Sequence, residues 1–316
     1  MLHVLTITAP IYLLIAVGYF AVRGGLLQKS DTRALGRFVF MFGLPALLFS
    51  ALTQRHAEAH IEWGYMAAYG VGSGLAMLGT ILYARKVRGA SVPLAAVQGM
   101  SSAASNTAFI GFPILYELLG PSAGMALAMC FIIENLFVMP LGLAYADSTG
   151  GSGKLKAALL RSARSLVRNP LLWGLGLGLV FRALGWHLPA VPEKAVQMVS
   201  VVASPLALFV VGGSLVGLRL GHHIRDVITV VGAKLLLHPL LVGLLVLALP
   251  AIDPRLGIAA VVNAAMPMAV VVTVLAQQYE QEEFSAATLL VATLSSFITI
   301  NVLLMVVAPL LPAAGQ

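Results

Sequence analysis

Two asparagines, each followed by a proline within an apolar segment, are the residues of this sequence best suited to chemistry. Asn106 precedes Gly111 and Pro113 in one segment, and Asn263 precedes Pro267 in another. A proline lacks the amide hydrogen and clashes with the preceding turn, so it leaves a backbone carbonyl unpaired. If the two interrupted helices cross, amides and helix ends converge on a point that carries partial positive charge and suits a carboxylate. The alternative is a proline kink with a capping asparagine that serves helix packing alone.

Ionisable side chains inside apolar segments are functional candidates by default. Glu134, with Asn135 beside it, could carry a proton or bind a cation, or it could lie near an interface or pair with a polar neighbour. Lys234 could attract an anionic substrate, although snorkelling to the nearby surface is the favoured interpretation. His238 could titrate near neutral pH, but a packing role is favoured.

Small polar residues form two further candidate faces. The first suits either a substrate path or helix packing, and the second suits either a site wall or a scaffold contact. The first face leads to Asn106 and consists of Gln98, Ser101, Ser102 and Ser105. The second lies on the last apolar segment and consists of Ser295, Ser296, Thr299 and Asn301.

The elements that position these residues are indicated by composition. The chain has 316 residues, of which 59% are hydrophobic and 10% charged. Soluble globular proteins carry about 25% charged residues, so this chain lacks the polar surface that water requires. The sequence predicts an all-α integral membrane protein. The single Cys130 allows no internal disulfide, and the net charge of +7 comes without an aromatic-basic platform for nucleic acid.

Ten segments are long and apolar enough to span a bilayer, which takes about 20 residues. The first lacks a basic leader and a small-residue cleavage site, so we expect it to be retained. The ten segments are approximately 2–22, 34–53, 63–84, 93–117, 124–145, 171–186, 195–218, 228–249, 257–279 and 286–311.

The two halves of the sequence share a pattern that predicts an internal repeat. Pro-x-x-Leu-Phe occurs in the second and seventh segments, and an Asn-to-Pro motif occurs in the fourth and ninth. An odd number of spans per half places the halves in opposite orientations, and interrupted helices at matching positions indicate a binding site near the midplane. We therefore expect repeats at 1–146 and 171–316, joined by a basic linker at 147–170.

The distribution of Lys and Arg predicts the orientation, because basic loops stay in the cytoplasm. With both termini outside, most of the 19 basic residues fall in cytoplasmic linkers. These are Arg23, Lys29, Arg33, Arg37, Arg85, Lys86, Arg88, Lys154, Lys156, Arg161, Arg164, Arg168, Arg219 and Arg225.

Ten spans in inverted halves, Asn-x-x-x-x-Gly-x-Pro at 106–113, Asn-x-x-x-Pro at 263–267 and a basic central loop resemble the auxin efflux carrier family. The short loop is similar to that of the bacterial members described as malonate or other organic-acid transporters. The resemblance implies a crossover of the two interrupted helices, a substrate site beside it, elevator-type motion, a homodimer and residence in the bacterial inner membrane. It allows malonate or an auxin-like acid as substrate. The ninth segment lacks the glycine that the fourth has before its proline.

The absence of common catalytic motifs argues against an enzyme. HExxH, GxSxG and Walker A motifs are absent, and no Cys/His/Asp cluster has metal-ligand spacing. We expect no cofactor or metal, with transport driven by H+ or Na+ coupling or by facilitated diffusion. A channel remains an alternative, because proline-broken helices also line pores, and a membrane receptor or scaffold is another.

Overall fold

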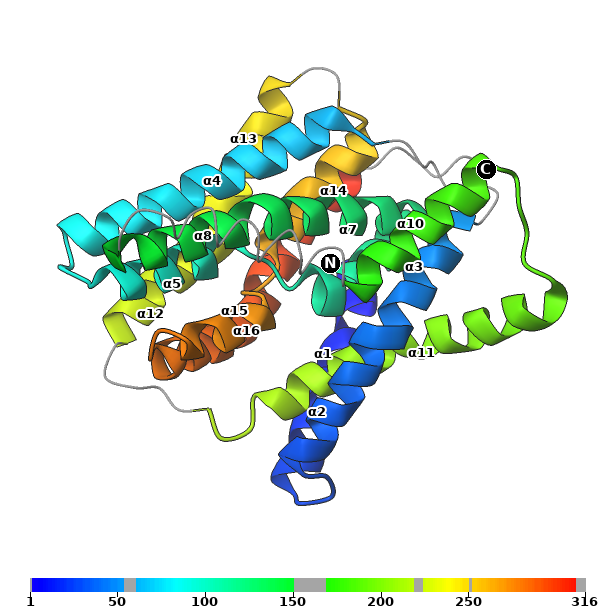
Figure 1. Ribbon diagram of the computed structural model, residues 1–316, viewed down its shortest axis with the longest axis horizontal. Coiled ribbons are helices and arrows are strands. Elements are labelled where there is room, and N and C mark those ends of the chain that lie inside the picture. Colours follow the sequence, from blue (N-terminus) through cyan, green and yellow to red (C-terminus); the bar gives the residue numbers. More distant parts are fainter. Residues whose placement is uncertain (1, 54–60, 151–168, 219–223, 250–251, 311–316) are drawn as a thin grey trace. The chain divides into compact units, whose positions relative to one another are not determined.

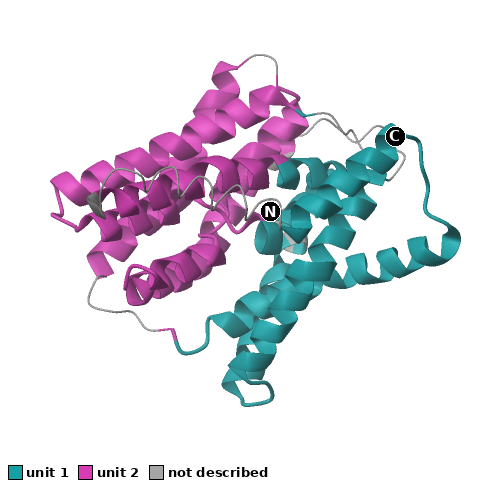
Figure 2. Cartoon of the chain, in the orientation of Figure 1, with its two compact units in different colours: residues 1–61, 108–128, 167–217 teal, residues 62–107, 129–166, 218–316 magenta. Residues whose placement is uncertain are grey.

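The computed structural model describes residues 2–53, 61–150, 169–218, 224–249 and 252–310 (Figure 1). Every regular element in these ranges is helical, as the composition predicts. The chain divides into two compact units: unit 1 with residues 1–61, 108–128 and 167–217, and unit 2 with residues 62–107, 129–166 and 218–316 (Figure 2). Each unit draws on both predicted halves, so the compact units do not follow the repeat boundary. The predicted linker lies largely outside the described residues.

Unit 1 is built on long apolar helices. Helix α1 packs along α11, and α3 packs against both α10 and α11. Helix α2 continues through a π-helical turn, Val39–Gly43, into α3. The helices are α1 (Leu2–Arg23), α2 (Lys29–Phe38), α3 (Leu44–Thr53), α6 (Phe112–Leu119), α10 (Pro170–Ala183), α11 (Ala190–Ser214) and the first part of α7 (Ser122–Ile133).

Glycines bring the helices of unit 1 into backbone contact. A Cβ atom at Gly212 would overlap the carbonyl oxygen of Ile15, and one at Gly18 would overlap that of Phe209. A Cβ at Gly174 would lie 2.5 Å from the carbonyl oxygen of Pro45. Small residues allow this close packing of membrane helices, where dispersion replaces the hydrophobic effect as the attractive force.

Unit 2 contains the remaining helices, arranged around α4 and α5. At one end of α4, Arg88 Nε donates to Asp226 Oδ1 at 2.8 Å, and this contact raises the pKa of the Arg88 guanidinium. The helices are α4 (Trp63–Lys86), α5 (Val92–Ala103), the end of α7, α8 (Met139–Ala146), α12 (Ile224–Gly232), α13 (His238–Ala248), α14 (Pro254–Ala265), α15 (Val270–Gln277) and α16 (Glu282–Val307).

A π-helical turn of five residues precedes a proline at several places in the chain. The turns Val39–Gly43, Thr107–Gly111, Glu134–Val138 and Ala233–Leu237 each end two residues before a proline. A proline removes one helical hydrogen bond and its ring presses on the carbonyl four residues earlier. Widening that turn relieves the clash and leaves the helix continuous. Two of these turns carry the ionisable candidates Glu134 and Lys234.

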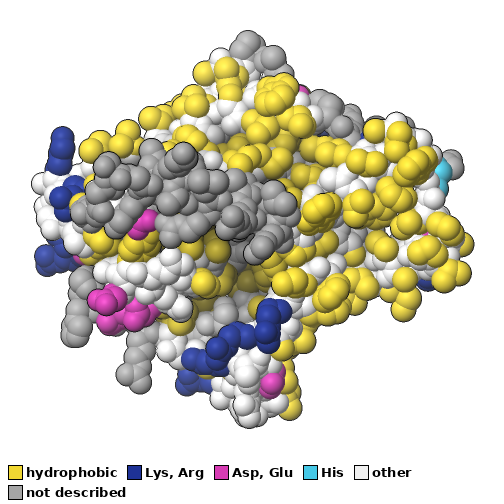
Figure 3. Space-filling model, in the orientation of Figure 1, with side chains coloured by type: hydrophobic (Ala, Val, Ile, Leu, Met, Phe, Trp, Pro, Cys, Tyr) yellow, Lys and Arg dark blue, Asp and Glu magenta, His cyan; other side chains and the backbone are white. Residues whose placement is uncertain are grey.

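The surface has the apolar character that lipid requires. Six described helical stretches are long and apolar enough to cross a membrane, and Thr8–Arg23, Thr107–Leu119 and Pro170–Ala183 are shorter apolar helices. Large hydrophobic side chains such as Val191 and Leu247 are more than four-fifths exposed. Hydrophobic side chains spread over the visible face in Figure 3, whereas Lys and Arg gather at a few places. The chain is a multi-pass membrane protein, and the count of ten spans stays a prediction.

Candidate functional site

Two helices of unit 2, α5 and α14, are each followed by an extended break, and the two breaks pair with each other. Helix α5 ends at Ala103 and α14 ends at Ala265. Beyond them, Ser105 and Met268 form an isolated antiparallel bridge. Asn106 N donates to Pro267 O at 2.8 Å, and Ala269 N donates to Ala104 O at 3.1 Å. Each break thus supplies hydrogen-bond partners for backbone groups of the other. A backbone group without a hydrogen bond in the membrane interior costs several kcal/mol.

The two asparagines lie at this crossover and each keeps a free polar atom. Both side chains are almost fully buried. Asn263 Nδ2 donates to the Tyr65 hydroxyl at 2.9 Å. Within the described part of the chain, Asn106 Nδ2 and Asn263 Oδ1 have no hydrogen-bond partner. Native proteins pair nearly all buried polar groups, so such atoms call for an explanation.

Lys234 is fully buried beside the crossover, and the expectation that it snorkels to the surface is wrong. Its Nζ donates to Ser105 Oγ at 2.6 Å and to Ala264 O at 2.8 Å, and lies 2.9 Å from His238 Nδ1. These three acceptors match the three donors of an ammonium group. The π-helical turn Ala233–Leu237 turns Lys234 toward the interior of unit 2.

Glu134 lies on the other side of Ser105. Its Oε1 accepts from the Ser105 backbone N–H at 2.8 Å and from the Tyr69 hydroxyl at 2.8 Å, and the Cys130 thiol is 3.6 Å away. The side chain is 4% exposed. Ser105 therefore touches both the ammonium and the carboxylate, and it belongs to the same break that carries Asn106.

Histidine and tyrosine complete the cluster and fix its proton positions. Because the Lys234 ammonium can only donate, His238 Nδ1 accepts, and Nε2 carries the ring proton and donates to Ser73 Oγ at 2.9 Å. The rings of Tyr65 and Tyr69 stack at 6.0 Å and 12°, and Tyr69 lies 5.6 Å from the His238 ring. The favoured packing role of His238 thus includes hydrogen bonds on both of its ring nitrogens.

Several predicted candidates lie elsewhere or have hydrogen bonds within their own helical segment. Asn135 Nδ2 donates to Phe131 O and Asn301 Nδ2 to Phe297 O, both within their own helices. Ser102 Oγ donates to Gly99 O at 2.8 Å and lies 3.4 Å from Ala76 O of α4. Ser295 is half-buried in α16. Gly111 and Pro113 fall in unit 1, at the start of α6.

The contribution of α4 was not predicted from the sequence. Tyr65, Tyr69 and Ser73 are spaced by four residues, which places them on one face of a helix. All three are fully buried and bond the crossover cluster. Polar residues at a strict interval of four in an apolar span were the signal that could have identified them.

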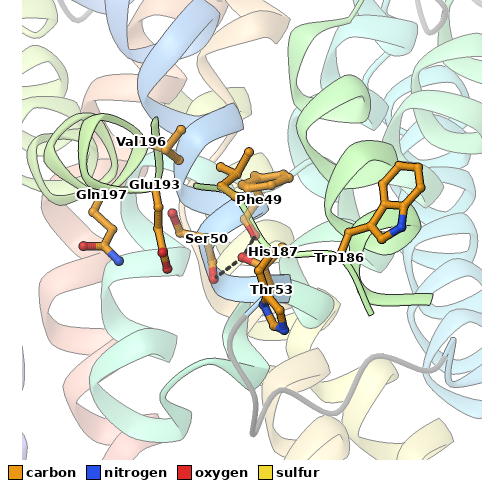
Figure 4. Close-up of a pocket in the computed structure, with 9 residues that line it drawn as sticks. Phe49, Ser50, Thr53, Trp186, His187, Glu193, Val196 and Gln197 are labelled. Carbon is orange, nitrogen blue, oxygen red and sulfur yellow. Dashed lines mark hydrogen bonds between the residues drawn. The ribbon is translucent and has the colours of Figure 1, made fainter. Parts of the chain in front are cut away.

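Unit 1 holds a separate cavity at one end of α3. It has a volume of about 340 Å³ and lies between α3, the segment after α10 and the start of α11 (Figure 4). Thr53 Oγ1 donates to Phe49 O at 2.9 Å, so its hydroxyl is engaged by the backbone. Its lining residues are Phe49, Ser50, Thr53, Trp186, His187, Leu188, Glu193, Val196 and Gln197. None of the site residues predicted from the sequence lines this cavity.

The described residues hold no group of three or more His, Cys, Asp or Glu side chains able to bind a metal. The crossover instead offers a buried ammonium, free amide atoms and a carboxylate. Paired helix breaks of this kind within a multi-pass membrane protein are typical of solute carriers.

Comparison with known proteins identifies the family. The family model described as "Membrane transport protein" matches residues 3–305. The chain therefore belongs to this family of membrane transporters, the auxin efflux carriers.

Relatives from three kinds of organism resemble the chain over most of its length. The "Putative malonate transporter" of Rhizobium meliloti is 28% identical over 310 residues, which cover 96% of each chain. An "Uncharacterized transporter" of Methanothermobacter thermautotrophicus is 25% identical, over 92% of this chain and 94% of its own. "Auxin efflux carrier component 8" of Arabidopsis thaliana is 23% identical, over 66% of this chain and 71% of its own. The family and these relatives are transporters, which agrees with the expectation that the chain is not an enzyme.

Proposed function

We propose that this protein is a secondary transporter of a small organic anion, with malonate or a similar carboxylate as substrate and the crossover of unit 2 as its site. The observation that carries the proposal is the free Asn106 Nδ2 donor, buried next to the residue that binds Lys234. An amide donor and an ammonium group together suit a carboxylate, because hydrogen bonds to charged groups are the strong ones. The name of the Rhizobium relative supports malonate, and that of the Arabidopsis relative keeps auxin-like acids open.

One helix N-terminus adds to the positive character of the site. Helix α15 begins at Val270, directly after the second break, and its first N–H groups point toward the break. The partial positive charge at a helix N-terminus favours a bound anion. The side-chain donors and the N-terminus of α15 thus favour an anion, whereas the C-termini of α5 and α14 carry the opposite partial charge.

Transport then follows from alternating access of this one site to the two sides of the membrane. We include in the proposal ten spans in two inverted repeats, an elevator-type motion, a homodimer, the bacterial inner membrane as location and H+ or Na+ as the coupling ion. The paired interruptions support the repeat, since inverted halves place matching helix breaks at one depth.

Uptake of labelled malonate into proteoliposomes tests the site. We expect Asn106→Ala to weaken transport about ten- to hundredfold, because a hydrogen bond to a charged group contributes about 1.5–3 kcal/mol. Asn263→Ala should weaken transport as well, because Asn263 Nδ2 donates to the Tyr65 hydroxyl beside the crossover. Gln277→Ala, which removes an exposed amide at the end of α15, is the matched control and should transport like wild type. Equal transport by all four proteins would refute the site.

A channel or facilitator is the second candidate, because proline-interrupted helices also line pores. Counterflow separates the two: unlabelled malonate inside the vesicles accelerates entry of the label through a carrier, whereas a pore gives no such stimulation. A receptor or scaffold would move no solute in either experiment.

A further inference from the structure

We propose that binding of a carboxylate at the crossover is coupled to uptake of one proton by Glu134, through a hydrogen-bonded relay that runs from Lys234 over Ser105 and Tyr69. The inference rests on the proposed function and deepens it, because it names the coupling ion and the residues that handle it.

The relay is defined by the donors and acceptors of the cluster. Lys234 Nζ donates to Ser105 Oγ, so the Ser105 hydroxyl proton points elsewhere, and Tyr69 Oη lies 3.1 Å away. The Tyr69 hydroxyl is 2.8 Å from Glu134 Oε1, and a carboxylate can only accept. The consistent assignment is therefore Ser105 Oγ–H donating to Tyr69 Oη and Tyr69 Oη–H donating to Glu134 Oε1. A continuous chain of hydrogen bonds joins the ammonium to the carboxylate.

Charge balance in the buried cluster supplies the reason for coupling. Glu134 is the single acidic side chain that the described contacts connect to Lys234, and His238 is neutral with Nδ1 accepting. The other titratable groups around them, Tyr65, Tyr69 and Cys130, are buried hydroxyl and thiol groups. The empty site thus holds one positive and one negative charge. A bound carboxylate adds a second negative charge, and an uncompensated buried charge is strongly disfavoured.

Protonation of Glu134 restores the balance. The Lys234 ammonium passes a proton to Ser105 Oγ, Ser105 passes its own to Tyr69 Oη, and Tyr69 passes its own to Glu134 Oε1. The Lys234 amine takes a proton from hydronium and pairs with the incoming carboxylate. One N–H bond breaks and one forms, one O–H bond forms on Glu134, and hydronium becomes water. The result is a neutral site that holds one anion and one extra proton.

Two residues have separable parts in this scheme. Glu134 holds the proton, so its substitution changes the number of protons bound. Tyr69 is a positioning residue that passes the proton, so its substitution slows the exchange and leaves the number unchanged. A purely structural role for either residue would not produce this division between stoichiometry and rate.

The test measures proton uptake on ligand binding by purified protein in weakly buffered detergent solution, with acetate and indoleacetate, which each carry one charge, as probes at a pH where both are fully ionised. We expect about one proton per bound anion for wild type, since binding linked to protonation takes up protons. Glu134→Gln should bind without uptake, and Tyr69→Phe should keep the stoichiometry with slower uptake in stopped flow. Glu283→Gln and Tyr83→Phe, which change exposed residues of unit 2, are the matched controls and should behave like wild type.

A second measurement needs no variant. The infrared difference spectrum of wild type on addition of isotopically labelled malonate should gain the band of a protonated protein carboxyl group, with the ligand's own bands displaced by the label. Binding of a probe without this band and without proton uptake overturns the relay and leaves the transport proposal standing. Failure of every probe to bind or to be transported overturns both.

Discussion

Ser105 connects every charged group of the candidate site. Its backbone N–H binds Glu134, its hydroxyl binds Lys234 and Tyr69, and its backbone pairs with the second helix break at Met268. A movement of either interrupted helix therefore changes the environment of both charges. This single residue links the backbone geometry of the crossover to its electrostatics.

Removing one charge of the cluster should destabilise the protein more than removing both. In Lys234→Met, Glu134 loses its positive neighbour while buried, and breaking a buried charge pair costs about 3–5 kcal/mol. We expect a clear fall in the apparent unfolding temperature in detergent. Adding Glu134→Gln should recover part of the loss, because the two sites interact and their effects do not add.

Lys86→Met provides the control for this comparison, since Lys86 is an exposed lysine at the end of α4 in the same unit. It should unfold at the wild-type temperature. A double variant no more stable than Lys234→Met alone would show that the two charges do not compensate each other.

At the scale of elements, the prolines determine where the functional side chains point. Pro140 follows the π-helical turn that carries Glu134, and Pro239 follows the turn that carries Lys234. A π-helical turn adds a residue to the helix and rotates everything before it relative to a regular helix. The sequence reveals the proline but not the widened turn. The sequence therefore favours a Lys234 side chain that reaches the membrane surface, whereas the widened turn directs it into unit 2.

Replacing Pro239 should impair transport without impairing the helix. Pro239→Ala restores a helical hydrogen bond and removes the ring clash, which favours a regular α-helix over the turn at 233–237. Lys234 then rotates away from Ser105 and Ala264, and we expect malonate uptake to fall about tenfold or more through loss of charged hydrogen bonds. Pro45→Ala is the matched control, because its turn, Val39–Gly43, carries no ionisable residue. Equal loss in both variants would assign the effect to helix packing.

Helix contacts in unit 1 depend on glycine in a way that substitution can measure. Alanine favours a helix over glycine by about 1 kcal/mol, yet a Cβ at Gly212 would overlap the backbone of α1 at Ile15, which cannot turn aside. Overpacking of this kind costs about 1–3 kcal/mol. We expect Gly212→Ala to lower the apparent unfolding temperature and Gly176→Ala, which meets nothing within 4 Å, to maintain or raise it. A stabilised Gly212→Ala would contradict the close contact of α1 and α11.

Much of the crossover could be predicted from sequence because Asn and Pro carry strong local signals. Each breaks or caps a helix within a few residues of itself, so Asn106 and Asn263 were found without knowledge of their neighbours. Tyr69 and Ser73 neither break nor cap a helix, and their spacing of four indicates a polar face of α4 without indicating its partners. Their role depends on contacts with residues 36 to 165 positions away, namely Ser105, Glu134 and His238, and no local pattern encodes those contacts.

At the scale of the whole molecule, the repeat and the compact units describe different properties of the chain. The predicted repeat concerns how the chain enters the bilayer, whereas the units gather helices that pack together. Unit 2 contains α5 and α14, the helices that precede the two breaks, although they come from different halves. A carrier of the elevator type requires a part that holds the substrate and a part that does not. The concentration of the charged cluster in unit 2 is consistent with unit 2 being the substrate-holding part of the proposed mechanism.

The orientation of the chain can be tested with single cysteines. Cys130 is the sole cysteine and is fully buried, so Cys130→Ser gives a cysteine-free protein that does not react with the thiol reagent. Basic linkers stay in the cytoplasm, so Glu193→Cys at the start of α11 should lie outside and Lys86→Cys at the end of α4 inside. In intact bacteria, a membrane-impermeant thiol reagent should label the first and not the second, and both should react after permeabilisation. The reverse pattern would invert the predicted orientation of the chain. Labelling of both positions in intact cells would place an even number of spans between residues 86 and 193, which contradicts the inverted repeat.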